Sequence, residues 1–104
     1  CYITDAIEGF IKVIASGKSG EVYNIGNNKP EVSVKEIFKI LKTINSTKIN
    51  HEFVKYPKSY PLDEPQRRCP DISKAKKHLD FYPKIKLING LKFYLSWAQK
   101  NYKY

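Results

Sequence analysis

The sequence lacks several features that would fix its class at once. It has no methionine and only two cysteines, Cys1 and Cys69, among 104 residues. Two cysteines cannot form the disulfide framework of a small secreted domain, so a reduced, cytoplasmic setting fits best. No run approaches the roughly 18 apolar residues of a membrane span, and no signal peptide is visible, so no membrane partner is expected.

Residue patterns that build metal or catalytic sites are also sparse. His51 and His78 have no second ligand at metal spacing, which excludes a recognisable metal site. The five glycines occur singly or as GKSG, so no glycine-rich phosphate loop opens a helix. Tyr82 and Lys86 match a Tyr-x-x-x-Lys pair, but Pro83 lies between them and opposes the helix that such a pair needs.

The chain holds one small domain, residues 1–104, with a modest core. A hydrophobic content of 41% and an aromatic content of 13% suffice for that core. The net charge of +9 would suit a polyanion, but the lysines are scattered over nearly every segment, which favours a solvated surface. The chain begins at Cys1 and enters apolar structure directly, so we expect it to be a piece of a longer protein.

Apolar periodicity predicts about four helices. Thr4 or Asp5 can cap the first helix, and Gly17 ends it. Ser33 and Glu36 form a capping box that opens the second helix. The expected apolar faces of these two helices are Ile7, Phe10, Ile11 and Ile14, and then Ile37, Phe38, Leu41 and Ile44.

Two shorter stretches complete the predicted helices. Asp71 is expected to cap a short helix that ends at about Leu79, and a last helix runs from about Leu87 to Tyr102. The inward face of the last helix is expected to hold Leu87, Leu91, Tyr94, Leu95 and Ala98, while Trp97 lies in the core or at a domain interface.

Two β-rich runs predict short strands, EVYNIG at 21–26 and INHEFV at 49–54. The fold class is therefore α/β, with about four helices, two short strands and a long proline-rich loop. Two strands alone are marginally stable, so this thin layer is expected to lean on a neighbouring domain.

The proline-rich loop carries the best candidate site. Its stretch DEPQRRCPD contains Arg67 and Arg68, the only arginines among 19 basic residues. A guanidinium is a rigid fork that grips phosphate or carboxylate with two hydrogen bonds, whereas lysine is a mobile point charge. The alternative is that both arginines pair with nearby acids. Tyr56 and Tyr60 either stack on a base or simply pack beside the prolines.

Three motifs, taken together, resemble the C-terminal third of an extended short-chain dehydrogenase/reductase. They are YITD before the first helix, YNIG before the capping box, and DEPQRRCPD before the last two helices. The third motif is most similar to UDP-glucuronate decarboxylases, which make UDP-xylose; nucleotide-sugar epimerases and 4,6-dehydratases are related. The resemblance implies a small domain that closes over a nucleotide sugar, beside a Rossmann half that is absent here.

The resemblance also implies roles for individual residues. An arginine at the position of Arg68 contacts the substrate's phosphates or sugar in relatives, and in one bacterial branch it has an acid role near the carboxylate. Arg67 is a weaker candidate for substrate binding, and Tyr60 matches a tyrosine near the substrate in some members. The NAD site and the catalytic Tyr-x-x-x-Lys would lie upstream of Cys1, so this chain alone is expected to be inactive and without cofactor or metal.

For the full-length enzyme the resemblance implies NAD, a UDP-sugar such as UDP-glucuronate, and a homodimer. A 4-epimerase or a 4,6-dehydratase remains an alternative to the decarboxylase. From another class, a small basic nucleic-acid-binding module remains open, because the segment KFYLSWAQKNYKY interleaves lysines with aromatic residues. A third alternative is a partly molten truncation product whose inward faces lack a partner.

Overall fold

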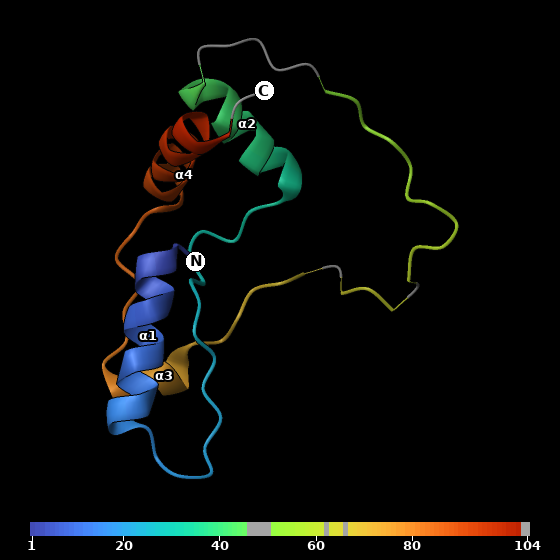
Figure 1. Ribbon diagram of the computed structural model, residues 1–104. Coiled ribbons are helices and arrows are strands. Elements are labelled where there is room, and N and C mark those ends of the chain that lie inside the picture. Colours follow the sequence, from blue (N-terminus) through green and yellow to red (C-terminus); the bar gives the residue numbers. More distant parts are fainter. Residues whose placement is uncertain (46–50, 62, 66, 103–104) are drawn as a thin grey trace.

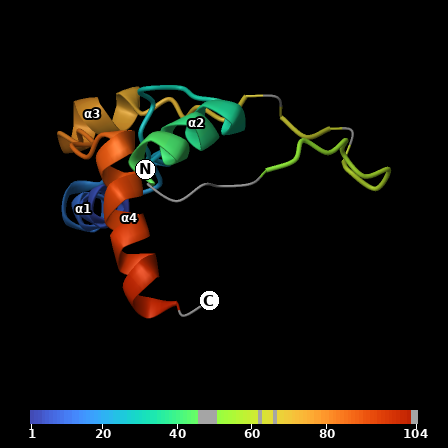
Figure 2. The ribbon, with the colours of Figure 1, turned by 90° about the horizontal axis from the view of Figure 1, so that it is seen from above.

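A computed structural model describes residues 1–45, 51–61, 63–65 and 67–102. Within these ranges it contains four helices, α1 (Ile3–Ser16), α2 (Val34–Ile44), α3 (Ser73–Leu79) and α4 (Leu87–Asn101). Helices α1 and α3 pack together at one end, and α2 and α4 pack together at the other (Figure 1). Residues 51–61 and 63–65 run out to one side of the helices (Figures 1 and 2).

The helix predictions are confirmed, whereas the two strands are wrong for the described residues. No strand is present at 21–26 or at 51–54, and residues 49–50 lie outside the described ranges. Residues 21–26 still alternate, because Tyr23 and Ile25 pack against the core while Val22 is exposed. A strand needs a hydrogen-bonded neighbour, and the described part of the chain offers this segment none.

The core lies between α1, α3 and the segments beside them. Its buried residues are Ile72, Ala75, Leu79 and Phe81. Val13 of α1 packs against this cluster, together with Tyr23 and Ile25 of the extended segment. Such a small core leaves stability sensitive to every contact in it.

Gly9 is the point of closest approach between α1 and this core. A Cβ atom at Gly9 would lie 2.4 Å from Ile25 Cγ2 and 3.1 Å from Phe81 Cε2. We expect Gly9→Ala to lower the free energy of unfolding by about 1–3 kcal/mol, because the helix must move away from Ile25. Urea denaturation followed by circular dichroism measures the change. Ser16→Ala, at the exposed end of the same helix, is the control and is expected to change it by less than about 0.5 kcal/mol.

The helix ends match the sequence in part. The Ser33–Glu36 capping box is present: Glu36 N donates to Ser33 Oγ, and Ser33 N donates to Glu36 Oε2. Gly17 ends α1 as expected. The predicted N-cap of α1 was wrong, because Tyr2 is the N-cap and Thr4 and Asp5 lie inside the helix.

Asp71 lies one residue further out than expected. Ile72 is the N-cap of α3, and Asp71 Oδ1 accepts hydrogen bonds from the backbone and hydroxyl of Ser73. These bonds hold the pKa of the Asp71 carboxyl below its ordinary value. The acid therefore still supports the start of α3.

Asp5 has a different task from the predicted cap. Its side chain is buried, with 3% exposed, and Oδ2 accepts hydrogen bonds from Lys84 N at 3.1 Å and Ile85 N at 2.9 Å. Asp5 thus ties α1 to the segment that leads into α4, about 80 residues later in the chain.

The second helix pair is less buried than the first. The α2 residues Ile37, Phe38, Leu41 and Ile44 and the α4 residues Leu87, Leu91, Leu95 and Ala98 are half-buried. Tyr94, predicted to face inward, is 57% exposed, and Trp97 is about half exposed. The aromatic side of α4 therefore turns outward instead of joining a core.

One face of α1 is apolar but exposed. Its members recur at helical spacing, and they are Ile3, Ile7, Phe10, Ile11 and Ile14. The side that packs on α3 carries Gly9 and Val13 instead. A row of large apolar side chains in water marks a contact surface.

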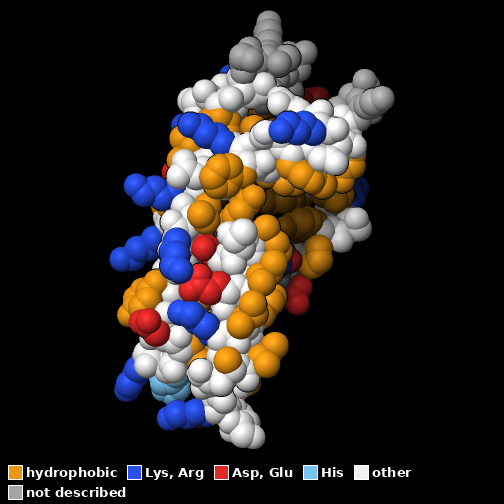
Figure 3. Space-filling model, turned by 60° about the vertical axis from the view of Figure 1, so that its left-hand side comes forward, with side chains coloured by type: hydrophobic (Ala, Val, Ile, Leu, Met, Phe, Trp, Pro, Cys, Tyr) orange, Lys and Arg blue, Asp and Glu red, His pale blue; other side chains and the backbone are white. Residues whose placement is uncertain are grey.

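The surface is hollowed between the two helix pairs. Figure 3 shows this hollow lined by hydrophobic side chains, with basic and acidic side chains interspersed over the rest of that face. Across the described ranges, no helix is both long enough and apolar enough to cross a bilayer.

Candidate functional site

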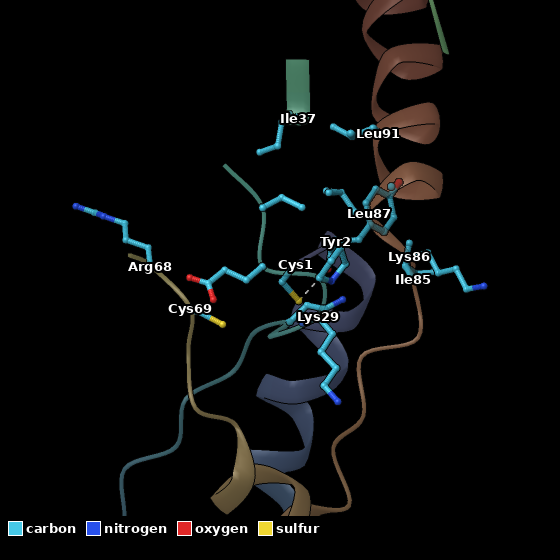
Figure 4. Close-up of a pocket in the computed structure, with 15 residues that line it drawn as sticks. Cys1, Tyr2, Lys29, Ile37, Arg68, Cys69, Ile85, Lys86, Leu87 and Leu91 are labelled. Carbon is cyan, nitrogen blue, oxygen red and sulfur yellow. Dashed lines mark hydrogen bonds between the residues drawn. The ribbon is translucent and has the colours of Figure 1, made fainter. Parts of the chain in front are cut away.

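A cavity of about 310 Å³ lies where the two helix pairs meet (Figure 4). Four parts of the chain form its wall: the start of α1, residues 27–32 with Ile37, the end of the proline-rich loop, and residues 85–91. Because these parts are far apart in the sequence, the cavity exists only in the folded chain.

The wall of this cavity is mostly basic where it is charged. Lys29, Lys86 and Arg68 line it, and Glu31 is its acidic residue. Three cations on the wall of one cavity favour an anionic ligand such as a phosphate or a carboxylate. In Figure 4 the side chains of Lys29 and Lys86 extend outward in different directions, so a ligand at the cavity would have to draw them toward it. Arg68 was predicted from the sequence, whereas the two lysines and Glu31 were not, because they lie outside the motif that contains the two arginines.

Arg68 contributes to the cavity from its rim. In Figure 4 its side chain extends away from the other labelled residues. Its Nη2 pairs with Glu64 Oε1, and the side chain is 71% exposed. A ligand phosphate would therefore compete with Glu64 for this guanidinium.

Arg67 makes a different contact. Its Nε donates to Glu31 Oε1 at 2.7 Å, and its Nη2 donates to Glu31 Oε2 at 2.5 Å. The Arg67 guanidinium holds the pKa of the Glu31 carboxyl below its ordinary value. Both arginines thus pair with acids, as the alternative predicted: Arg68 pairs with Glu64 of the motif, and Arg67 pairs with Glu31, which lies outside it.

Tyr60 does not line the cavity. Its ring stacks on Tyr56, with centroids 4.2 Å apart and planes 28° apart. Loss of hydration raises the pKa of the Tyr60 phenol, and the Glu64 carboxylate adds to the effect. The two tyrosines therefore stack on each other, and each covers one face of the other ring.

A wider groove adjoins the cavity. Its volume is about 840 Å³, and it shares Lys29, Pro30, Ile85, Lys86 and Leu87 with the cavity. Lys76 and Lys84 add further positive charge beside apolar walls. The cavity and the groove form one region with a basic border, and this region is large enough for a ligand made of several chemical groups.

The other candidates from the sequence do not form sites. Tyr82 and Lys86 lie in a non-helical segment, as predicted. His51 packs between Phe38 and Phe53, and His78 Nδ1 lies 3.3 Å from the Tyr23 hydroxyl. No group of three metal-ligating side chains occurs in the described ranges.

No glycine-rich cofactor loop leads into α2, α3 or α4. Ser33, Ile72 and Lys86 are the residues before the first turns of these three helices. These three helix starts therefore lack the glycine-rich turn by which a Rossmann fold holds the phosphates of a dinucleotide.

Known proteins resemble this chain over nearly all of its length. No protein-family model matches. Human dTDP-D-glucose 4,6-dehydratase is 34% identical over 105 residues, which cover 97% of this chain and 29% of that protein. UDP-glucuronic acid decarboxylase 3 of Arabidopsis thaliana is 36% identical over 91 residues, or 88% of this chain and 25% of that protein.

A solved structure agrees with these matches. A mutant of UDP-glucuronic acid 4-epimerase from Bacillus cereus, in complex with UDP-4-deoxy-4-fluoro-glucuronic acid and NAD, superposes with a TM-score of 0.82 at 33% identity. The superposition covers 97% of this chain and 31% of that one. The chain thus spans less than a third of the length of the proteins it matches.

Proposed function

We propose that this chain, which corresponds to the C-terminal portion of the NAD-dependent epimerase/dehydratase family, is the substrate-binding part of a nucleotide-sugar enzyme. The observation that carries the proposal is the cavity bordered by Lys29, Lys86 and Arg68. Its cations match the charge of a diphosphate, and the adjoining groove has room for a sugar or a base.

UDP-glucuronate is the proposed substrate, and decarboxylation is the proposed reaction of the whole enzyme. The support is the similarity of DEPQRRCPD to decarboxylases and the presence of UDP-glucuronic acid decarboxylases among the relatives. A 4,6-dehydratase acting on a dTDP-sugar is the second candidate, because the human dehydratase matches more of the chain. Identities of 33% to 36% do not separate these reactions.

Further parts of the proposed enzyme lie outside the described residues. We propose that a preceding nucleotide-binding half holds NAD and supplies the catalytic groups, since no glycine-rich loop leads into α2, α3 or α4. The exposed row on α1 and the unpaired segment 21–26 would pack against that half. A homodimer of the whole enzyme stays part of the proposal.

Ligand selectivity tests the proposed function. We expect this chain to bind UDP-glucuronate more tightly than dTDP-glucose by about tenfold in calorimetric titrations at moderate salt. The reverse order would favour the dehydratase. Equal binding of UDP-glucuronate and a single-stranded oligonucleotide, with affinity falling steeply as salt rises, would contradict both and favour the nucleic-acid module.

A further inference from the structure

A single ion pair joins the proline-rich loop to the wall of the cavity. Arg67 and Glu31 are 36 residues apart, yet two guanidinium nitrogens meet both carboxylate oxygens. This fork-to-fork geometry fixes orientation as well as distance. Glu31 itself lines the cavity, so the pair connects the loop directly to the candidate site.

The residue on the other side of Arg68 is anchored to the same wall. Cys69 Sγ lies 3.6 Å from the carbonyl oxygen of Asn28, and Cys69 also lines the cavity. Pro70 then packs so closely on Gly26 that a Cβ atom there would lie 2.8 Å from Pro70 Cγ. Arg68 is therefore held on both sides, by Arg67 before it and by Cys69 after it.

This anchoring matters because the Arg68 side chain is exposed and long. A ligand that uses such a side chain must order it and the loop that carries it, and that ordering reduces affinity. Because these contacts restrain the residues on both sides of Arg68, less of the loop remains to be ordered when a ligand binds. The rim of the cavity is then prepared before the ligand arrives.

The same pair also affects the charge of the cavity. Glu31 is the acid on a wall that otherwise carries Lys29, Lys86 and Arg68. An unpaired carboxylate at this position would repel a diphosphate. Arg67 neutralises it with a charge that points to Glu31, so Arg68 is not drawn to this carboxylate and has only Glu64 as a competing acidic partner.

We propose that Glu31 and Arg67 are positioning residues that hold Arg68 at the cavity rim and mask the negative charge of the wall. The proposal rests on the proposed function, in which the cavity receives the diphosphate of a nucleotide sugar. Two adjacent arginines then have separate tasks: Arg67 binds the protein, and Arg68 binds the ligand.

A double-mutant cycle tests the pair, with UDP-glucose as the probe and titration calorimetry as the measurement. Arg67→Gln is expected to weaken binding about tenfold, because it frees the loop and exposes the Glu31 charge. Glu31→Gln is expected to weaken binding only about threefold, because it frees the loop and removes the charge. The double variant is expected to bind like Glu31→Gln, so that removing Glu31 partly rescues Arg67→Gln.

A matched ion pair away from the cavity is the control. Lys74 Nζ and Glu21 Oε2 are 2.8 Å apart, and neither residue lines the cavity. Lys74→Gln is expected to leave the affinity for UDP-glucose unchanged. The proposal is overturned if Arg67→Gln binds like the wild type, or if the two single effects multiply in the double variant.

The pH dependence of binding distinguishes an effect of the Arg67–Glu31 pair from a general loss of stability. Arg67 lowers the pKa of Glu31, so the pair persists above the ordinary glutamate value of 4.5 and is lost as the pH falls through the lower, folded value. The affinity ratio of wild type to Glu31→Gln is therefore expected to stay constant from pH 8 to pH 5 and to approach one only as the pH falls through the lowered pKa of Glu31. A ratio that changes between pH 8 and pH 5 would contradict the proposal.

If the wild type binds no UDP-glucose, amide hydrogen exchange of Arg68 in the absence of ligand still tests the Arg67–Glu31 pair. Faster exchange in Arg67→Gln and Glu31→Gln, but not in Lys74→Gln, would support the positioning pair while the proposed function fails. Unchanged exchange in all three variants would overturn the pair itself, whatever the ligand result.

Discussion

Replacing Asp5 with alanine is expected to lower the free energy of unfolding by about 3 kcal/mol. The buried Asp5 carboxylate accepts the backbone N–H groups of Lys84 and Ile85, and an alanine would leave both partly buried donors without that acceptor. The acid also lies in the first turn of α1, where the helix dipole favours negative charge. Urea denaturation followed by far-ultraviolet circular dichroism measures the loss.

Two variants separate this role from simple helix capping. Asp5→Asn keeps an oxygen acceptor and is expected to lose less, about 1 kcal/mol. Thr4→Ala changes the other residue that the sequence offered as a cap, and because Thr4 is exposed inside α1 it is expected to change stability by less than about 0.5 kcal/mol. An Asp5→Ala variant as stable as Thr4→Ala would show that the two hydrogen bonds contribute little.

The sequence was a good guide wherever the cause of a structure is local. Helical periodicity located all four described helices to within about two residues, and the Ser33–Glu36 box forms as predicted. The role of Asp5 as a buried acceptor could not be predicted from the sequence, because its hydrogen-bond partners are about 80 residues away. The same residue types serve as helix caps and as buried acceptors. Asp5 lies near the start of a helix, and it was therefore predicted to be a cap.

The strands failed for a different reason. Residues 21–26 keep the alternation that predicted a strand, since Tyr23 and Ile25 turn toward the core and Val22 turns away. Alternation reports which side of a segment is buried, whereas a strand also requires a hydrogen-bonded neighbour. The sequence shows which side of the segment is buried. Whether the segment has a hydrogen-bonded neighbour depends on what packs beside it.

The candidate site was predicted from its arginines, and its other charged residues became apparent only in the folded chain. Two arginines among many lysines drew attention to the loop, but Lys29, Lys86 and Glu31 belong to the cavity only because distant segments converge there. Glu31 was not singled out by any sequence pattern, and its role becomes visible only once Arg67 is placed against it.

The apolar row on α1 links the fold to the proposed enzyme. The periodicity of α1 was correct, yet its large apolar residues face outward and its small residues, Gly9 among them, face the core. A helix with small residues on one side and large apolar residues on the other is suited to lie between two layers. This arrangement supports the proposed second half better than a partly molten chain, because the inner side of α1 is specifically packed.

Replacing Arg68 with alanine is expected to weaken UDP-glucuronate binding by tenfold to about a hundredfold, the largest effect of any single substitution in the site. Arg68 is the lining residue whose planar fork is able to hold a phosphate by two hydrogen bonds, whereas Lys29 and Lys86 supply point charges. Titration calorimetry with UDP-glucuronate measures the change. Arg68→Lys keeps the charge but not the fork, so its affinity is expected to fall between those of the wild type and Arg68→Ala.

Glu64 provides a test in the opposite direction. In the free chain it occupies the Arg68 guanidinium that the ligand is proposed to use. Glu64→Gln weakens that competitor, so it is expected to raise the affinity for UDP-glucuronate about threefold in the wild-type background. In an Arg68→Ala background the same substitution is expected to have little effect, since no guanidinium remains to be released. If Glu64→Gln raised the affinity equally in both backgrounds, its effect would come from net charge alone, and Arg68 would lose its place as the phosphate-binding residue.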